Sequence, residues 1–172
     1  VCSLDKNDGS MIWKLKMRGD IFSSPCPTGK NIALGSMDHN LYLLSSIGEI
    51  IWNFETNGPI WSSPSYHEDL LYFGSDDGFI YSVDFDGSLK WKSKLDGKIR
   101  SSSPCISEDS VFVGTYEGGM YCLDNMDGIR KWNKKISRPV LSSPLLVKDK
   151  VMFGTSDCTL YCFNLLGSKI WN

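Results

Sequence analysis

The sequence predicts an all-β fold made of a repeated four-stranded antiparallel unit, and three observations predict it. Five of the six tryptophans recur about every forty residues, at positions Trp13, Trp52, Trp91, Trp132 and Trp171. A Ser-Ser-Pro triplet recurs between them and ends at Pro25, Pro64, Pro104 and Pro144. No long stretch carries a helical apolar period, and short runs of β-branched and aromatic residues alternate with turns.

Internal repetition at this period is typical of a β-propeller, in which each four-stranded antiparallel sheet is one blade. The chain divides into the end of one blade over residues 1–13 and four full blades over residues 14–52, 53–91, 92–132 and 133–172. We therefore treat residues 1–172 as a single partial propeller of about four and a half blades.

The first full unit illustrates the four strands expected in each blade. They are predicted over residues 21–24, 31–35, 41–44 and 50–54. Pro25 is expected to end the first of them, because proline cannot donate to the hydrogen-bond ladder between strands. This innermost strand would line the crowded central axis, where the small side chains of the Ser-Ser pair fit.

Turn residues separate the strands, and the third unit departs from the common spacing. Asp-Gly pairs at 77–78 and 86–87 predict tight hairpins, because Gly accepts positive φ and Asp tolerates it. One extra residue lies between Gly97 and Pro104, and another lies in the turn 124–128. We interpret the first as a bulge or shifted loop and the second as a lengthened turn.

The recurring aromatic residues have a structural interpretation. Tryptophan and tyrosine are large and flat, and each carries one polar group. We expect them between neighbouring blades, where stacked sheets lie about 10 Å apart. The tyrosines that recur with the tryptophans are Tyr42, Tyr81, Tyr121 and Tyr161.

Composition excludes several classes of partner. Lys and Arg number 18 against 20 Asp and Glu, which gives a net charge of −2. This balance does not indicate binding to nucleic acid or to an acidic membrane surface. No apolar run approaches the roughly 18 residues that a membrane-spanning helix requires.

The six cysteines favour a reducing compartment. Cys26 and Cys105 follow Ser-Ser-Pro triplets, and Cys122 and Cys162 follow recurring tyrosines. Equivalent positions in neighbouring sheets would lie about 10 Å apart, whereas a disulfide requires Cα atoms within about 7 Å. Buried free thiols are therefore expected, and they predict a cytoplasmic location.

Strand alternation predicts which loops share a face. The loops that enter each blade lie on the same side as the loops between its second and third strands, and loops on a rigid scaffold commonly carry function. Repeat-equivalent acidic residues there also have a turn-stabilising interpretation, and Trp61 has a packing one. The candidate partner-binding face comprises Asp38, His39, Trp61, Asp76, Asp77, Tyr116, Glu117, Arg138 and Asp157.

The repeat resembles a known family. The pattern Ser-Ser-Pro, Gly-Ser-x-Asp-Gly-x-Ile-Tyr and Asp-Gly-x-x-x-Trp is similar to the quinoprotein-type, or pyrroloquinoline-quinone-like, propeller repeat. The resemblance covers essentially the whole chain. The variants Ser-Ser-Pro-Cys and Asp-Cys-Thr-Leu-Tyr-Cys at 157–162 look most like the C-terminal propeller of the beta-alanine-activating enzymes of the acyl-CoA synthetase family.

The resemblance implies a ring of seven or eight blades, so we expect this chain to be a fragment of a larger propeller, with the remaining blades either upstream alone or both upstream and downstream. Quinone-dependent members carry a Ca²⁺ site of Glu, Asn and Asp, often with an adjacent Cys-Cys pair. They also use a Trp as the cofactor floor, and the resemblance therefore implies Trp61 as the residue to test. This sequence has no Cys-Cys pair and no uniquely placed acidic residue. No catalytic, cofactor or metal residue is therefore assigned, and no cofactor is expected.

The function expected from these observations is a non-catalytic scaffold or interaction module. Its partner would be another protein or other domains of a parent chain, and that parent would be an ATP-dependent acyl-adenylating enzyme in the cytoplasm. Two alternatives stay open at this point: a fragment of a quinone- and Ca²⁺-dependent dehydrogenase, and a free-standing propeller scaffold of the outer-membrane-assembly type.

Overall fold

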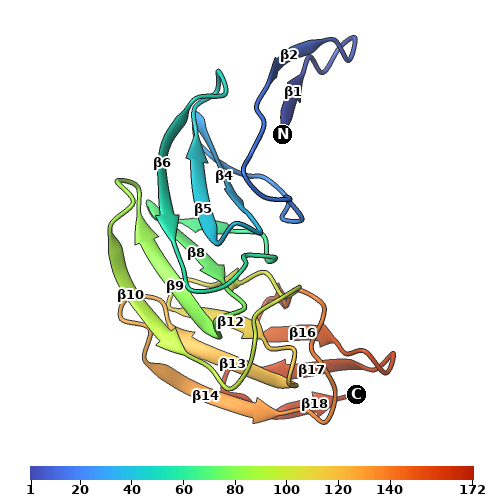
Figure 1. Ribbon diagram of the computed structural model, residues 1–172. Helices are drawn as coiled ribbons and strands as arrows, with labels where there is room; N and C mark the ends of the chain where they lie inside the picture. The colour runs from blue at the N-terminus through green and yellow to red at the C-terminus, as the bar shows by residue number, and fades with distance from the viewer.

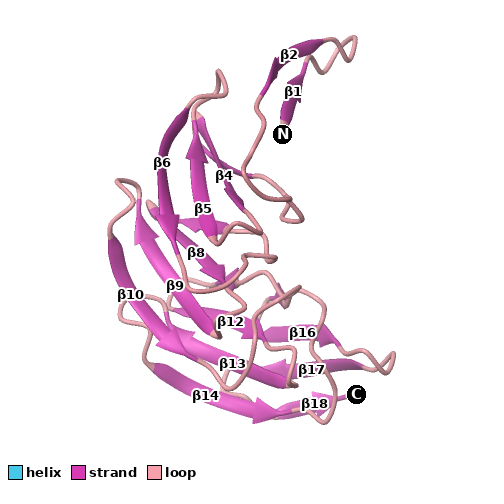
Figure 2. Cartoon of the chain, viewed as in Figure 1, coloured by secondary structure: helices cyan, strands magenta, loops and turns pink.

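The computed structural model describes residues 1–172 and consists of strands and loops without a helix (Figure 2). Sixteen strands form four antiparallel sheets of four strands, each in chain order, and two more form a separate hairpin. The hairpin, called the half blade below, consists of β1 (Cys2–Leu4) and β2 (Met11–Lys14). This arrangement confirms the predicted fold class of four-stranded blades with an additional half blade.

Each blade runs from an inner strand to an outer strand. The first blade comprises β3 (Cys26–Thr28), β4 (Asn31–Gly35), β5 (Asn40–Leu44) and β6 (Ile50–Glu55). The second comprises β7 (Ser65–His67), β8 (Leu70–Gly74), β9 (Phe79–Asp84) and β10 (Leu89–Lys94). The third comprises β11 (Cys105–Ile106), β12 (Ser110–Gly114), β13 (Gly119–Asp124) and β14 (Arg130–Lys135). The fourth comprises β15 (Leu145–Val147), β16 (Lys150–Gly154), β17 (Leu160–Asn164) and β18 (Lys169–Trp171).

The blades follow one another along an open arc (Figure 1). The half blade lies at one end of the arc, and the fourth blade lies at the other. The second and third strands of each blade are the most buried, whereas the outer strands alternate between exposed and partly buried residues.

The predicted inner strand over residues 21–24 is wrong, because the observed strand β3 begins after the proline, at Cys26. Ser23 explains the difference: its Oγ donates to the Gly35 carbonyl at 2.9 Å and accepts from the Gly35 N–H at 2.8 Å. A side chain thus replaces the ladder bonds that a strand would make. Pro27 lies inside β3, where a strand at the sheet edge tolerates a missing donor.

Neighbouring blades pack through apolar clusters. Clusters of 8, 9 and 8 buried residues fill the spaces between the four complete blades. Their larger members include Phe73 between the first and second blades, Tyr72 between the second and third, and Phe112 between the third and fourth. These clusters hold the blades in one rigid arrangement, which positions the loops at either end of the strands.

The recurring tryptophans join each blade to the next one, as the sequence predicts. Each of the first four indole N–H groups donates to a carbonyl in the outer hairpin turn of the following blade, at Ser46, Phe85, Asn125 and Leu165. The glycine of that turn lies against the indole face. At Gly87, for example, an added Cβ atom would lie only 3.0 Å from the Trp52 ring. Any larger residue there would meet the ring.

Candidate functional site

The candidate site is on the face formed by the loops that enter each blade and the loops between its second and third strands. Backbone hydrogen bonds join these two loop sets within each blade, for example from Asp76 N–H to Pro59 O at 2.9 Å and from Tyr116 N–H to Lys98 O at 2.8 Å. The predicted residues therefore do share one face. The structure divides them into a cluster near the axis and a set of turn residues.

The cluster near the axis is called the aromatic–arginine cluster here, and it contains Phe22, Trp61, Asp76, Arg100 and Tyr116. The Arg100 guanidinium lies 5.3 Å from the Trp61 ring centroid and 5.1 Å from the Tyr116 centroid. Its Nη2 donates to Asp76 Oδ2 at 2.7 Å, and its Nε donates to Oδ1 at 3.3 Å. The hydrogen bond and charge of Asp76 hold the pKa of Arg100 above its usual value.

Phe22 extends this cluster onto the first blade. Its ring centroid lies 4.7 Å from that of Trp61, and its side chain is 62% exposed. A cavity of about 340 Å³ is lined by Phe22, Trp61, Arg100 and three axial serines. The Trp61 Nε1 atom is shielded from solvent and has no hydrogen-bond partner. The surface thus offers aromatic faces and one guanidinium in one place.

Two of the predicted acidic residues stabilise turns. Asp38 Oδ2 accepts from Tyr42 Oη at 2.8 Å, and Asp77 Oδ2 accepts from Tyr81 Oη at 2.6 Å. Burial and the Asp38 carboxylate together raise the pKa of Tyr42 to about 12. Burial opposes ionisation of Asp38, but hydrogen bonds from Tyr42, Ser36 and Asn40 outweigh it and lower the pKa of Asp38. Each of these carboxylates therefore already accepts a hydrogen bond from the tyrosine of its own hairpin.

The equivalent acidic residues of the third and fourth blades also serve local structure. Glu117 accepts the Lys98 N–H at 2.6 Å, and its neighbour Gly118 has the positive φ of 82° that this turn requires. Asp157 accepts from Thr155 Oγ1 at 2.6 Å, and this bond lowers the pKa of Asp157. The turn-stabilising interpretation therefore describes Asp38, Asp77 and Asp157, whereas Glu117 joins its turn to the entering loop of the same blade.

His39 and Arg138 do not join the aromatic–arginine cluster through any contact. His39 occupies the left-handed region with φ of 75°, and its carbonyl accepts the Thr56 N–H at 2.9 Å. The Arg138 side chain is exposed and forms no ion pair. Both residues lie on the predicted face, and the structure gives neither of them a partner-binding feature of its own.

Arg100 is the residue that sequence reasoning missed. It follows Ile99, which occupies the position of Ile60 and Val140 in the other blades, as equivalent backbone hydrogen bonds show. The extra residue of the third unit therefore lies at Arg100–Ser101. The interrupted spacing was the available signal, but spacing alone does not show where an inserted side chain points.

Serines line the axis beneath this cluster. The Ser24 N–H donates to Ser63 Oγ at 2.8 Å, the Ser63 N–H to Ser103 Oγ at 3.0 Å, and the Ser103 N–H to Ser143 Oγ at 3.1 Å. Each bond crosses from one blade to the next one. Small hydroxyl side chains at the axis are therefore required to connect the blades, in agreement with the predicted role of the Ser-Ser pair.

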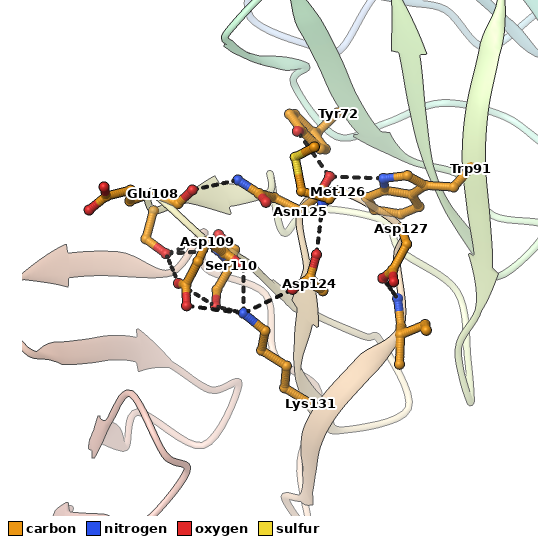
Figure 3. Close-up of polar contacts among 12 residues, drawn as sticks. Tyr72, Trp91, Glu108, Asp109, Ser110, Asp124, Asn125, Met126, Asp127 and Lys131 are labelled. Atoms are coloured by element: carbon orange, nitrogen blue, oxygen red, sulfur yellow. Dashed lines mark hydrogen bonds and ion pairs between the residues drawn. The ribbon is translucent and has the colours of Figure 1, made fainter.

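On the opposite face, a polar network joins the second and third blades (Figure 3). The Asn125 carbonyl accepts from Trp91 Nε1 at 2.9 Å and from Tyr72 Oη at 3.3 Å. Lys131 Nζ lies 3.2 Å from Asp109 Oδ2 and 3.3 Å from Asp124 Oδ2. The second inserted residue lengthens this turn, as predicted, and the network connects strands rather than exposing a reactive group.

The donor set does not fit the calcium site of a quinone enzyme. No three or more His, Cys, Asp or Glu side chains gather where they could hold a metal ion.

All six cysteines are free, and Cys122 and Cys162 are buried. Burial raises the pKa of the Cys122 thiol to about 11, so it is a neutral packing residue. No segment forms a helix long and apolar enough to cross a bilayer.

Comparison with known families identifies the repeat. The family model described as outer membrane protein assembly factor BamB, PQQ_2, matches residues 46–172. The chain belongs to this family. Membership agrees with the pyrroloquinoline-quinone-like repeat expected from the sequence, whereas a relation to the beta-alanine-activating enzymes does not follow from it. No curated protein sequence matches the chain.

Solved structures show the same fold for this member of the family. The BamB structure from Moraxella catarrhalis superposes with a TM-score of 0.82 at 18% identity, over 95% of this chain and 56% of that one. The computationally designed Ika4 protein superposes with a TM-score of 0.76 at 14% identity, over 87% and 93%. The designed Ika8 protein gives 0.84 at 13% identity, over 94% and 51%. The chain thus spans about half the length of BamB.

Proposed function

We propose that this chain is a non-catalytic interaction scaffold that contacts a protein partner through the aromatic–arginine cluster. The observation that carries the proposal is the stack of Phe22, Trp61, Arg100 and Tyr116, whose two ends, Phe22 and Tyr116, are exposed. Aromatic residues and arginine dominate the binding energy of protein interfaces when they are desolvated together. The turn carboxylates around them are already hydrogen-bonded, which leaves this cluster as the feature available to a partner.

Site-specific photo-crosslinking tests the proposal. Phe22 is replaced by p-benzoylphenylalanine in the natural full-length polypeptide, and its crosslinks are identified by mass spectrometry. Leu166 is the matched control, because it is 83% exposed but lies in an outer hairpin turn on the opposite face. We expect one dominant crosslinked protein or domain from position 22, lost with Trp61→Ala, and none from position 166. Equal labelling from both positions would contradict the proposal.

We further propose that the parent protein is a cytoplasmic, ATP-dependent acyl-adenylating enzyme and that its other domains are the partner. Two observations support this: the repeated free cysteines, which suit a reducing compartment, and the Cys-containing repeat variants that resemble beta-alanine-activating enzymes. The mass of the natural polypeptide, measured with an antibody against this segment, tests it. A band several times larger than 19.3 kDa supports a multidomain parent.

A free-standing propeller scaffold is the second candidate function, and the description of the matching family as an outer membrane protein assembly factor favours it. In this case the same antibody should detect a band only about twice the mass of the chain, since the chain spans 56% of the BamB structure. That result would contradict the proposal that the parent protein is an acyl-adenylating enzyme. The crosslink from position 22 would then be to a separate protein.

A further inference from the structure

The outermost strand of the second blade, β10, has one free edge on the outer side of the arc (Figure 1). It pairs only with β9, and their ladder continues to the Leu95 N–H, which donates to the Gly78 carbonyl at 2.9 Å. Antiparallel strands bond to a given neighbour at every second residue, so the backbone N–H and carbonyl groups of Lys92 and Lys94 point away from β9. A row of free groups of this kind can accept an added strand.

The side chains of Lys92 and Lys94 share one face of this sheet. Across the ladder they stand opposite Tyr81 and Phe79, respectively, and both lysines are exposed. Their Nζ atoms lie 5.2 and 4.7 Å from the centroid of the Phe79 ring. One aromatic ring therefore holds two ammonium groups beside the free edge.

No carboxylate of the chain neutralises these two ammonium groups. The one ion pair of β10 joins Lys90 to Asp84, with Nζ and Oδ2 at 3.1 Å. Lys94 donates to the backbone carbonyl of Asp77, and Lys92 has no hydrogen-bond partner. The net charge of −2 for the whole chain thus conceals a local excess of positive charge at this edge.

This combination is specific to the second blade. At the positions of Lys92 and Lys94, the first blade has Asn53 and Glu55 in β6, and the third has Asn133 and Lys135 in β14. The position of Phe79 is occupied in the other complete blades by Asn40, Gly119 and Thr159. Two lysines over an aromatic ring are therefore not a requirement of the repeat.

We propose that the edge of β10 binds an extended segment of a partner protein that carries Asp or Glu at two alternate positions. Alternate side chains of a strand lie on one face about 7 Å apart, which is also the spacing of Lys92 and Lys94 along β10. Two acidic side chains of an added strand would therefore stand opposite both ammonium groups. The free backbone groups hold the segment, and the two cross-strand ion pairs set its register.

The occupant is not a second copy of this chain. None of the eighteen strands contains more than one acidic residue, so no strand of a second copy has the required pattern. Pairing of two β10 edges would place lysines opposite lysines, which is unfavourable. Lysine on an edge strand is a common protection against association. Here the same lysines repel the chain's own outer strands and attract an acidic one.

The inference is independent of the proposed function. The aromatic–arginine cluster lies near the axis, at the loops that enter the blades, whereas β10 is the outermost strand of its sheet. A partner could therefore occupy either surface without the other.

NMR titration of the isotope-labelled chain tests the proposal. The probe is the capped peptide Thr-Val-Glu-Val-Glu-Val-Thr, added to millimolar concentration. We expect the amide signals of Lys92 and Lys94 to shift and their hydrogen exchange to slow, because both N–H groups gain an acceptor. The control peptide Thr-Val-Val-Glu-Glu-Val-Thr has the same composition but places its glutamates on opposite faces of a strand. It should bind at least about threefold more weakly and should not slow the exchange.

Charge exchange makes the test specific to β10. The double variant Lys92→Glu, Lys94→Glu should bind the probe at least about tenfold more weakly and should instead bind a probe with lysine in place of glutamate. The matched control is Lys30→Glu, Lys150→Glu, which changes the net charge equally at exposed lysines outside β10 and should leave binding unchanged.

Three results would overturn the proposal. The first is equal binding of the two acidic peptides, which would indicate attraction by charge without strand pairing. The second is an unchanged pair of amide signals for Lys92 and Lys94 at millimolar probe. The third is an equal loss of binding in the two double variants.

Discussion

At the scale of single residues, the equivalent acidic position of the repeat has different hydrogen-bond partners in different blades. Asp38 and Asp77 accept tyrosine hydroxyls, whereas Glu117 accepts a backbone N–H and Asp157 accepts a threonine hydroxyl. Arg100 exists only because one blade has an additional residue in its entering loop. The interrupted repeat thus adds a guanidinium beside Trp61 and Tyr116, which occupy regular positions of the repeat.

The Asp38–Tyr42 pair gives a titration that can be predicted with its sign. The folded-state pKa of Tyr42, about 12, lies above the value near 10 of an unfolded chain. Its contribution to stability is therefore complete below about pH 10 and is lost as the pH rises through about 12. Replacing Asp38→Asn removes the negative charge, so the Tyr42 pKa should fall, as followed by the ring-carbon NMR signal.

Asp157→Asn is the control for this titration. The Asp157 carboxylate accepts from Thr155 and not from the recurring tyrosine of its own blade. The Asn substitution there should leave the Tyr42 titration where it is in the unaltered chain. An equal fall of the Tyr42 pKa in the two variants would show that the contact with Asp38 is not the cause.

At the scale of elements, the end of each second strand decides how closely neighbouring blades approach. The strand ends in glycine, and the entering loop of the next blade places a branched residue on it, as Ile99 on Gly74. The axial serine then bridges the N–H and carbonyl of the same glycine, as Ser62 does for Gly74 at 3.0 Å on both sides. One residue thus connects a strand, an axial loop and the next blade.

Gly74→Ala and Gly154→Ala should differ in their effect on stability. A Cβ at Gly74 collides with Ile99, whereas a Cβ at Gly154 meets only Ser142, at 3.5 Å or more. We expect Gly74→Ala to lower the free energy of unfolding by about 1–3 kcal/mol and Gly154→Ala to change it by less than about 1 kcal/mol. Urea denaturation followed by tryptophan fluorescence measures both, and similar losses would contradict this account of the junction.

At the scale of the whole molecule, the chain is an open arc whose blades touch only their neighbours (Figure 1). Stability in such arrays is close to a sum of terms for each unit and each junction. The three junctions between complete blades bury clusters of 8, 9 and 8 residues, and the junction to the half blade buries three. The half blade is therefore the least stabilised part of the arc.

Hydrogen exchange should reveal this gradient. We expect amides of β1 and β2 to exchange at least about a hundredfold faster than those of β8, β9, β12 and β13, because local opening of the half blade sacrifices few buried contacts. The outer strand β18 is an internal comparison, since its residues are exposed yet belong to a complete sheet. Uniform protection of β1 and β13 would show that the half blade is held by contacts other than those described.

The repeat spacing alone determined the antiparallel blades, the tryptophan junctions and the serine-lined axis, because these depend on residue types that recur at equal intervals. The tertiary structure alone decided that residues 21–24 are not a strand, since Ser23 satisfies Gly35 through its side chain. It alone placed Arg100 between Trp61 and Tyr116, because the direction of an inserted side chain depends on how two blades pack, which is not encoded in local spacing.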